Sequence, residues 1–383
     1  MELHFVFCEK IETMRNLYYS LPLFLCAILA CAQKDDNIVE IEKDYEFEII
    51  TDQLEIPWGL DFFEDASFLA TEKEGNLYHF KNGNLKQISN VPEILLKGQG
   101  GLMDVKIHPD FKNNQFIYLS FADQGENDKE GNTKIIRAKF DGSQLSNIKE
   151  IYKALPNSTK PYHFGSRIEF DDQGYLYFSI GDRGNRDENP QDIQRDCGKI
   201  YRLHDDGSIP DDNPFVNDEG AKKAIYSYGH RNPQGMERNP RTGKIWVHEH
   251  GPRGGDEINI IQPGENYGWP VVSYGINYDG TSFTEETEQE GMTQPIHYWV
   301  PSIAPSGMTF VTSDKYPDLK GNLLVGSLKF LYLEHCILDG DKVVRREKIL
   351  KNVGRLRSVE QSPNGFIYAG IEGVGIVKIL PKS

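Results

Sequence analysis

The sequence predicts an all-β protein: a six-bladed β-propeller of four-stranded blades, with long inserted loops on one rim. A composition typical of strands, a sixfold repeat and the lack of a long amphipathic helix pattern support this prediction. Glycine (36 residues), proline (20 residues) and aromatic side chains (11%) are abundant, which suits many short strands joined by tight turns. A chain of 383 residues is long enough for one large propeller.

Each repeat begins with a small or apolar residue and continues with a run in which apolar residues alternate with others. A turn rich in Asp, Asn and Gly follows, and then a second run of residues that favour strands. The first runs lie near 58–62, 101–105, 165–168, 235–237, 307–310 and 357–360. The second runs lie at 68–71, 116–120, 175–179, 245–247, 322–325 and 365–369. One unit cannot bury both of its faces, so six units predict a closed ring.

A β-sandwich or a β-solenoid is the alternative fold, but each unit holds enough residues for the four strands of a propeller blade. The starts of the units are unevenly spaced along the chain. We therefore expect the extra residues to form functional loops on one rim of the ring.

The beginning of the chain has the pattern of an export signal. An apolar run over 17–30 is too short to span a bilayer comfortably and ends in small residues before Cys31. Arg15 directly follows Met14, which indicates Met14 as the true initiator. The run before Cys31 resembles the lipobox of bacterial lipoproteins, and an ordinary cleaved signal is the alternative.

These features predict three parts of the chain: a lipoprotein-type signal peptide over 1–31, a polar tether over 32–45 and a catalytic propeller over 46–383. The protein is then exported, and is periplasmic or a lipoprotein of the outer membrane or cell surface. We expect it to meet the membrane only through a lipid on Cys31.

Charge and cysteine content exclude several function classes. Forty-two basic residues against 58 acidic ones give a net charge of −16, which repels nucleic acids and anionic lipid headgroups. Outside the signal, only Cys197 and Cys336 remain, and there is no Cys/His zinc pattern. We predict no nucleic-acid partner and two buried free thiols.

A His and an Asp flank one predicted hairpin. His163 precedes the run at 165–168 and Asp182 follows the run at 175–179, so both lie at the same end. A carboxylate in this place orients an imidazole and raises its basicity. A lone His is more often a structural hydrogen-bonding group, but the pair predicts a general base that removes a hydroxyl proton.

Other polar residues stand in the predicted inserts. Gln99 lies among three glycines, and Arg231 and Asn232 belong to a polar stretch directly before a strand. An anionic, carbonyl-rich ligand would satisfy such a cluster. Exposure on the surface is the alternative interpretation.

Basic residues late in the chain extend this prediction. Arg355 and Arg357 alternate around one residue, so an extended backbone places both on one face. With Lys329 they predict a local positive pocket in an acidic protein. The adjacent carboxylates of Asp256 and Glu257, beside glycine carbonyls, suit a hard cation such as Ca²⁺, although their spacing is not that of an EF-hand.

Nine stretches of the chain are similar, in the same order, to those of one enzyme family: GQGGLMDVKIHPDF, HFGSRIEF, IGDRGNRD, YGHRNPQGM, EHGPRGGDEINII, NYGWP, PSIAPSG, GSLK and GRLRSV. The chain resembles the soluble glucose and aldose sugar dehydrogenases that depend on pyrroloquinoline quinone (PQQ), and most of all the aldose sugar dehydrogenases. The resemblance runs from about residue 54 to the C-terminus. It implies oxidation of an aldose to its lactone, an external electron acceptor, and PQQ and Ca²⁺ as cofactors.

The resemblance also implies roles for matching residues. His163 matches the base that takes the proton of the anomeric hydroxyl while hydride passes to PQQ, and Asp182 matches its supporting carboxylate. Arg231 matches a residue that stabilises negative charge developing on the cofactor. Contacts with PQQ are implied for Gln99, Arg231, Asn232, Lys329, Arg355 and Arg357.

Four metal ligands are implied in the same way. Gly251 and Pro252 match the backbone carbonyls that hold the Ca²⁺ beside PQQ. Glu257 and Tyr267 match ligands of a second, structural Ca²⁺.

Two positions depart from the family pattern. Val300 stands where aldose sugar dehydrogenases often have Asp and the glucose enzyme has Trp, and Phe330 stands where the glucose enzyme has a basic residue. The sugar itself is therefore not predicted. A metal-dependent lactonase and a non-catalytic binding propeller are the alternative functions.

Overall fold

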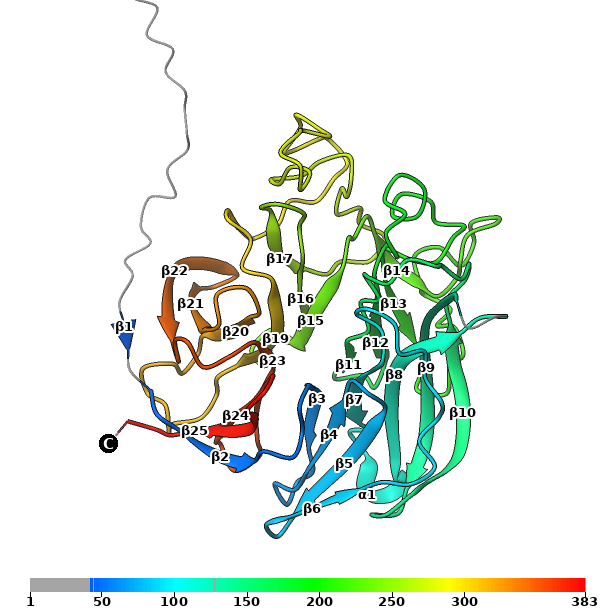
Figure 1. Cartoon of the computed structure of the whole chain (residues 1–383). Coiled ribbons are helices and arrows are strands. Elements are labelled where there is room, and N and C mark those ends of the chain that lie inside the picture. Colours follow the sequence, from blue (N-terminus) through cyan, green and yellow to red (C-terminus); the bar gives the residue numbers. More distant parts are fainter. Residues whose placement is uncertain (1–41, 44, 127–128, 383) are drawn as a thin grey trace, which may run out of the picture. The chain divides into compact units, whose positions relative to one another are not determined.

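A computed structural model describes residues 42–43, 45–126 and 129–382 of this chain. These residues form six β-sheets arranged around a common centre (Figure 1). The predicted six-bladed propeller is therefore confirmed. Among the described residues, the only helix is α1 (Phe111–Asn114), a single turn in the second blade.

The first three blades follow one another along the chain. Blade 1 contains β3 (Pro57–Phe62), β4 (Phe68–Glu72), β5 (Asn76–Lys81) and β6 (Asn84–Gln87). Blade 2 contains β7 (Leu102–Ile107), β8 (Phe116–Gln124), β9 (Gly131–Phe140) and β10 (Leu145–Lys153). Blade 3 contains β11 (Ile168–Phe170), β12 (Leu176–Ile180), β13 (Lys199–Leu203) and β14 (Ile225–Tyr228).

The last three blades include the two N-terminal strands. Blade 4 contains β15 (Pro233–Arg238), β16 (Ile245–Glu249), β17 (Asp256–Ile260) and β18 (His297–Trp299). Blade 5 contains β19 (Pro305–Phe310), β20 (Leu323–Ser327), β21 (Leu333–Asp339), β22 (Lys342–Ile349) and β1 (Glu42–Lys43). Blade 6 contains β23 (Leu356–Gln361), β24 (Ile367–Ile371), β25 (Gly375–Ile379) and β2 (Phe47–Thr51).

The sixth blade shows how the ring closes. The last repeat supplies only three strands, and β2 from the start of the propeller pairs antiparallel with β25 to complete the sheet. The expectation that every unit supplies four strands is corrected in this blade. The strand β1 pairs in parallel with β22 and gives blade 5 a fifth strand.

The predicted runs are the two innermost strands of each blade. In blade 1, for example, Phe62 of β3 lies opposite Phe68 of β4 in an antiparallel pair. The inner strands β3, β7, β11, β15, β19 and β23 contact one another in order, and β23 contacts β3. The loops that precede these six strands therefore lie together at one end of the ring.

Apolar clusters fill the space between neighbouring blades. Blades 2 and 3 pack through Tyr118, Ile135, Phe178 and Tyr201, and the last two rings stack with centroids 4.8 Å apart. The other five blade interfaces each contain a cluster of the same kind. Each blade thus buries both faces only because it has neighbours, as the repeat pattern predicts.

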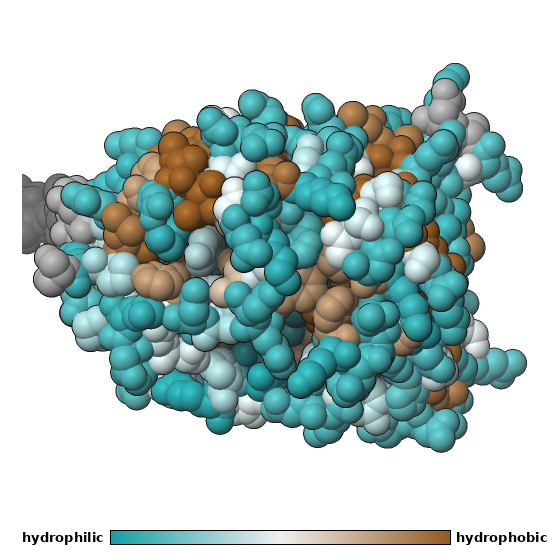
Figure 2. Space-filling model, turned by 90° about the horizontal axis from the view of Figure 1, so that it is seen from below, coloured by the Kyte–Doolittle hydropathy of each residue, from teal (hydrophilic) through white to brown (hydrophobic). Residues whose placement is uncertain are grey.

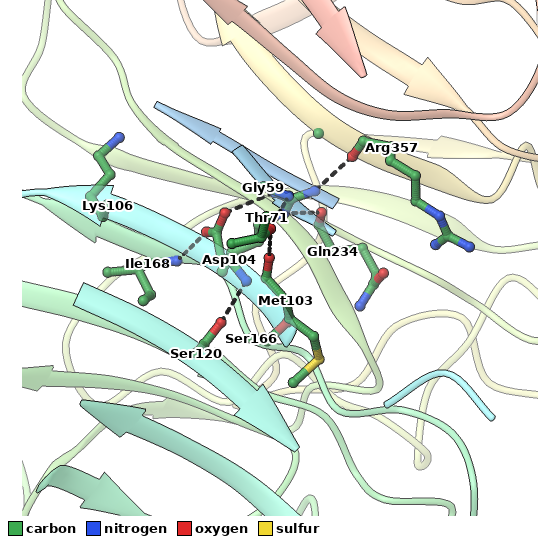
Figure 3. A network of polar contacts seen from close by, with 12 residues as sticks. Gly59, Thr71, Met103, Asp104, Lys106, Ser120, Ser166, Ile168, Gln234 and Arg357 are labelled. Carbon is green, nitrogen blue, oxygen red and sulfur yellow. Dashed lines mark hydrogen bonds and ion pairs between the residues drawn. The ribbon is translucent and has the colours of Figure 1, made fainter. Parts of the chain in front are cut away.

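A polar network crosses the centre of the ring (Figure 3). The Asp104 carboxylate accepts hydrogen bonds from the Ile168 backbone N–H at 2.9 Å and from Arg167 at 3.1 Å. The Arg167 guanidinium also donates to the backbone carbonyls of Gln234 and Arg357, both at 2.7 Å. One buried, fully paired arginine therefore ties together the inner strands of blades 2, 3, 4 and 6.

The surface of the face in Figure 2 is mostly hydrophilic, with hydrophobic residues in small separate patches. No helix in the described part of the chain is long and apolar enough to cross a membrane. Cys197 and Cys336 are buried free thiols, as predicted.

The predicted signal peptide over 1–31, with Met14 and Cys31, lies outside the described residues. Most of the predicted tether over 32–45 also lies outside them. At its end, Glu42–Lys43 forms β1, and Tyr45 is buried in the cluster between blades 5 and 6.

Candidate active site

A cavity of about 470 Å³ lies at the end of the ring where the inner strands begin. Its wall contains five predicted site residues: Gln99, His163, Asp182, Arg231 and Pro252. Gln99, His163 and Arg231 stand in the loops before β7, β11 and β15, and Asp182 follows β12. Neighbouring blades therefore deliver these polar groups to one place.

His163 and Asp182 are joined across the hairpin of β11 and β12, with Nδ1 and Oδ1 2.7 Å apart. His163 has a φ of 60°, in the left-handed region that side-chain-bearing residues seldom adopt. Its backbone N–H donates to Gln99 Oε1 at 2.8 Å, and its carbonyl accepts from the Arg183 N–H at 3.3 Å. These contacts hold a costly backbone conformation, a feature that often marks functional sites.

The surroundings keep the His163 ring neutral near pH 7. Burial and the Arg231 guanidinium lower the pKa of His163 below its ordinary 6.5, although Asp182 opposes the shift. Because Nδ1 faces a carboxylate, it carries the proton of the neutral ring, and Nε2 is left as an acceptor. This is the form of histidine that removes a proton.

Asp182 is 1% exposed, and its carboxylate accepts three hydrogen bonds. Besides His163, the Gly184 N–H donates to Oδ1 at 2.7 Å and the Trp269 indole N–H donates to Oδ2 at 2.9 Å. Burial raises the pKa of Asp182, but His163, Arg231 and Gly184 together outweigh it, and the net shift is downward. The buried carboxyl group therefore stays ionised.

Arg231 lies beside this pair and is 6% exposed. Its guanidinium donates to the His250 carbonyl at 3.0 Å and lies 5.3 Å from the centroid of the Trp269 ring. Asn232 is also buried, and its Oδ1 accepts a hydrogen bond from the Gly165 N–H at 3.1 Å. This amide supports the loop that carries His163.

Arg355 and Arg357 do share one face, and there they meet a carboxylate that the sequence analysis missed. Glu372 lies 2.8 Å from Arg355 Nε and 2.5 Å from Arg357 Nε. Burial lowers the pKa of Arg357, against the effect of Glu372. Lys329 is exposed, with its Nζ 5.0 Å from the centroid of the Phe330 ring.

Of the first pair of predicted metal ligands, Pro252 lies at the cavity and Gly251 directly precedes it. Pro252 is part of the wall, and its carbonyl accepts a hydrogen bond of 3.5 Å from Ser302 Oγ. The N–H of Gly251 donates to Asp256 Oδ1 at 2.8 Å. Neutral carbonyl oxygens of this kind are ligands that Ca²⁺ readily accepts.

The second pair lies deeper in blade 4. Glu257 stands opposite Glu249 in the β16–β17 pair, and burial followed by the charge of Glu249 raises the pKa of Glu257 well above its ordinary value. Tyr267 stacks on His230 at 4.6 Å and donates its O–H to the Ile260 carbonyl. A cation would relieve the repulsion of the two glutamates. Yet within the described residues no group of three or more His, Cys, Asp or Glu side chains is placed to hold one.

The cavity wall contains further residues to which the sequence analysis gave no role. They come from the inserts and include Tyr162, Arg186, Trp269, Asn277 and Tyr278. Arg186 donates to Asn277 Oδ1 at 2.8 Å and so joins two inserts that are far apart in the chain. Their positions depend on how long loops fold, for which the sequence carries no periodic signal.

The two departures from the family pattern lie together. Val300 is 58% exposed and Phe330 is 40% exposed, and both line a second cavity of about 390 Å³. Tyr332 and Arg346 also line it.

Comparisons with known proteins agree with this fold. The sequence pattern of the family described as Glucose / Sorbosone dehydrogenase matches residues 54–377. Aldose sugar dehydrogenase YliI of Escherichia coli (strain K12) is 41% identical over 328 residues, which cover 84% of this chain and 88% of that protein.

Two solved structures show the same architecture. The apo-form of the soluble aldose sugar dehydrogenase from Escherichia coli has a TM-score of 0.84 at 37% identity, covering 88% of this chain and 100% of that chain. The PQQ-bound form of an aldose sugar dehydrogenase from Streptomyces coelicolor has a TM-score of 0.72 at 25% identity, covering 88% of this chain and 97% of that chain.

The six-bladed ring and the carboxylate-bound histidine thus occur in a chain that is similar to propeller sugar dehydrogenases. The chain belongs to the glucose/sorbosone dehydrogenase family. The family resemblance predicted from the nine motifs is confirmed.

Proposed function

We propose that this protein oxidises an aldose sugar to its lactone with PQQ as the oxidant and passes the electrons to an external acceptor. The observation that carries this proposal is the 2.7 Å hydrogen bond between His163 and Asp182 on the wall of an open cavity. The PQQ-bound structure of the Streptomyces coelicolor relative supports the choice of cofactor.

The side chains at this end of the ring fit an anionic cofactor rich in carbonyl groups. Arg231 and Gln99 offer a guanidinium and an amide on the cavity wall. Arg355 and Arg357 carry two positive charges against the single negative charge of Glu372, so one charge is left for a carboxylate of the ligand. When bound, PQQ would supply the two-electron acceptor of the reaction.

The residues of the chain supply the proton chemistry. His163 Nε2 removes the proton of the sugar's anomeric hydroxyl, and Asp182 stabilises the imidazolium that forms. Arg231 holds a fixed positive charge beside the reacting groups, where it stabilises developing negative charge. Because the pKa of His163 lies below its ordinary 6.5, the base is ready at neutral pH.

We propose Ca²⁺ as the second cofactor. The carbonyls of Gly251 and Pro252 would hold one ion at the cavity, and Glu257 and Tyr267 would hold a structural ion in blade 4. Glu257 is half-buried and faces Glu249, and its raised pKa supports the second site because a cation there would favour both ionised carboxylates.

The proposal includes a place outside the cytoplasm. The apolar run before Cys31 supports export, and a lipid on Cys31 would tether the propeller to a membrane surface. An electron acceptor in the same compartment would then complete the reaction.

The test is to titrate the purified protein with PQQ and Ca²⁺, follow binding by absorption, and measure dye reduction with a panel of aldoses. We expect His163→Gln to keep PQQ binding and to lower kcat by about 10³-fold, the scale of a lost general base. His108→Gln, which alters a histidine in the loop after β7, at the other end of the ring, is the matched control and should leave kcat unchanged. Lactone turnover without PQQ, abolished by a chelator, would instead establish a metal-dependent lactonase.

A further inference from the structure

We propose that Trp269 is a positioning residue for the base, so that His163, Asp182 and Trp269 act as one hydrogen-bonded chain. This inference rests on the proposed function of His163. It adds a role for an indole that was outside the predicted set of site residues.

Trp269 is held firmly in place. It is 7% exposed, its backbone N–H donates to the Gly229 carbonyl at 2.9 Å, and its carbonyl accepts from the Gln191 side chain at 2.8 Å. Phe283 packs edge-on against the indole with ring centroids 5.3 Å apart. The indole N–H is thereby directed at Asp182 Oδ2, 2.9 Å away.

The two oxygens of Asp182 have separate partners. Oδ1 binds His163 Nδ1 and the Gly184 N–H, whereas Oδ2 binds only the Trp269 indole among the described residues. The terminal torsion of an aspartate is soft, so an anchor on the second oxygen restricts rotation of the carboxylate. Trp269 therefore holds Oδ1 towards the histidine.

The orientation of Asp182 decides which nitrogen of His163 carries the proton. A carboxylate in line with Nδ1 keeps the proton there and leaves Nε2 as the base. A carboxylate that rotates away would let the proton move to Nε2, and the ring could no longer accept the hydroxyl proton. Trp269 thus selects the reactive tautomer without touching the imidazole.

The Trp269 indole also lies beside the Arg231 guanidinium, so the contribution of its N–H donor must be separated from that of its ring. The Arg231 guanidinium lies 5.3 Å from the Trp269 ring centroid, a contact that a phenylalanine ring partly preserves. The substitution Trp269→Phe therefore removes the N–H donor and keeps a ring beside Arg231. Trp246→Phe is the matched control, because Trp246 is fully buried and its Nε1 has no hydrogen-bond partner among the described residues.

The first measurement uses the protein without PQQ and records ¹⁵N spectra of the His163 ring. We expect wild type and Trp246→Phe to show a single Nδ1–H tautomer, and Trp269→Phe to show a mixture of tautomers. A Trp269→Phe spectrum identical to that of wild type would overturn the proposal. Failure of PQQ to bind would count against the proposed function and leave this readout intact.

The second measurement uses the PQQ-loaded enzyme. We expect Trp269→Phe to lower kcat about tenfold while KM for the sugar and the affinity for PQQ stay within twofold of wild type, because the substrate contacts remain. Trp246→Phe should change none of these quantities. An unchanged kcat in Trp269→Phe would contradict the positioning role.

A third measurement holds even where Trp269→Phe fails to fold. The chain has four tryptophans, so its indole ¹⁵N–H spectrum is simple. We expect Asp182→Asn to shift the Trp269 indole signal and to leave those of Trp58, Trp246 and Trp299 in place. Four unmoved signals would refute the hydrogen bond on which the proposal depends.

Discussion

Where the inner strands begin, the Asp182 carboxylate accepts three hydrogen bonds and its pKa falls. Near the other ends of these strands, buried and half-buried carboxylates surround one lysine, and several of their pKa values rise. This second group, termed the carboxylate ring, consists of Asp61, Glu169, Glu237, Glu360 and Lys106. Its members occupy matching positions on β3, β11, β15, β23 and β7. Asp182 and the carboxylate ring thus have pKa shifts in opposite directions.

The charges next to each carboxylate explain the contrast. In the carboxylate ring, Lys106 Nζ lies 2.8 Å from Glu169, and Asp61 accepts from the Ile107 N–H at 2.6 Å. The buried Oε2 of Glu237 has no partner among the described residues. Burial followed by neighbouring carboxylates raises the pKa of Glu237 to about 8. Asp182 keeps its charge because His163, Arg231 and the Gly184 N–H together outweigh its burial, whereas neighbouring carboxylates add to the effect of burial on Glu237.

The largest expected effect is at the site end. Asp182→Asn removes the charge and lets the side chain donate to His163, which favours the wrong tautomer. We expect kcat to fall by about 10²- to 10⁴-fold, the range found when a carboxylate partner of a base is lost. Steady-state kinetics with a saturating aldose measure this change. Glu237→Gln, at the opposite end of the ring, should keep the wild-type kcat, and an equal loss in both variants would remove the distinction between the two ends.

A second prediction concerns the cation of the carboxylate ring. Burial lowers the pKa of Lys106, but the surrounding carboxylates raise it well above its ordinary value, so the lysine is firmly charged. Lys106→Met removes the positive charge from among these carboxylates. It should lower the free energy of unfolding by about 2–3 kcal/mol at neutral pH. Urea denaturation measures this loss. The exposed pair of Lys81 and Asp65, 2.7 Å apart, offers the control Lys81→Met, for which a change of about 0.5 kcal/mol or less is expected.

The fold and part of the site follow from sequence alone for a physical reason. In a strand, successive side chains point to opposite faces, so the runs that form β3 and β4 can be recognised in the sequence. His163 and Asp182 could be paired because they flank one predicted hairpin. The strand β2 was missed because it closes blade 6 from outside the repeat. Its partners are set by ring closure and not by neighbouring residues.

Contacts that depend on long inserts were also missed. Trp269 reaches Asp182 from an insert between β17 and β18, and Glu372 reaches Arg357 from the loop after β24. Neither spacing is periodic. The carboxylate ring could have been found from the sequence, because its charged residues occupy the same place in each repeat that contributes one. Leu60-Asp61-Phe62 and Ile168-Glu169-Phe170 are two examples. Aligning the repeats would have found it.

A third prediction tests the raised pKa in the carboxylate ring. Folding raises the pKa of Glu237 from 4.5 to about 8, so ionising it costs stability as the pH rises through that interval and costs nothing below it. Glu237→Gln should therefore raise the free energy of unfolding by a few kcal/mol near pH 8, at about 1.4 kcal/mol for each pKa unit, and change it little near pH 4. Thermal denaturation across this pH range shows the effect. The control Glu290→Gln changes an exposed side chain and should leave the free energy of unfolding within about 0.5 kcal/mol of wild type. A Glu237→Gln variant that is destabilised near pH 8 would refute the assignment.

The smallest expected effect is on the pH dependence of catalysis. Burial and Arg231 lower the pKa of His163 below 6.5, so its neutral form persists as the pH falls and is lost only below that value. We expect the acid limb of the kcat/KM profile to have its midpoint below pH 6.5. Near neutral pH, His163 and Glu237 are then both uncharged, one as a base ready for a proton and the other as an acid that has kept its own. Because they lie at opposite ends of the ring, Glu237→Gln should leave the acid limb in place, and a shifted limb would show that the two ends titrate together.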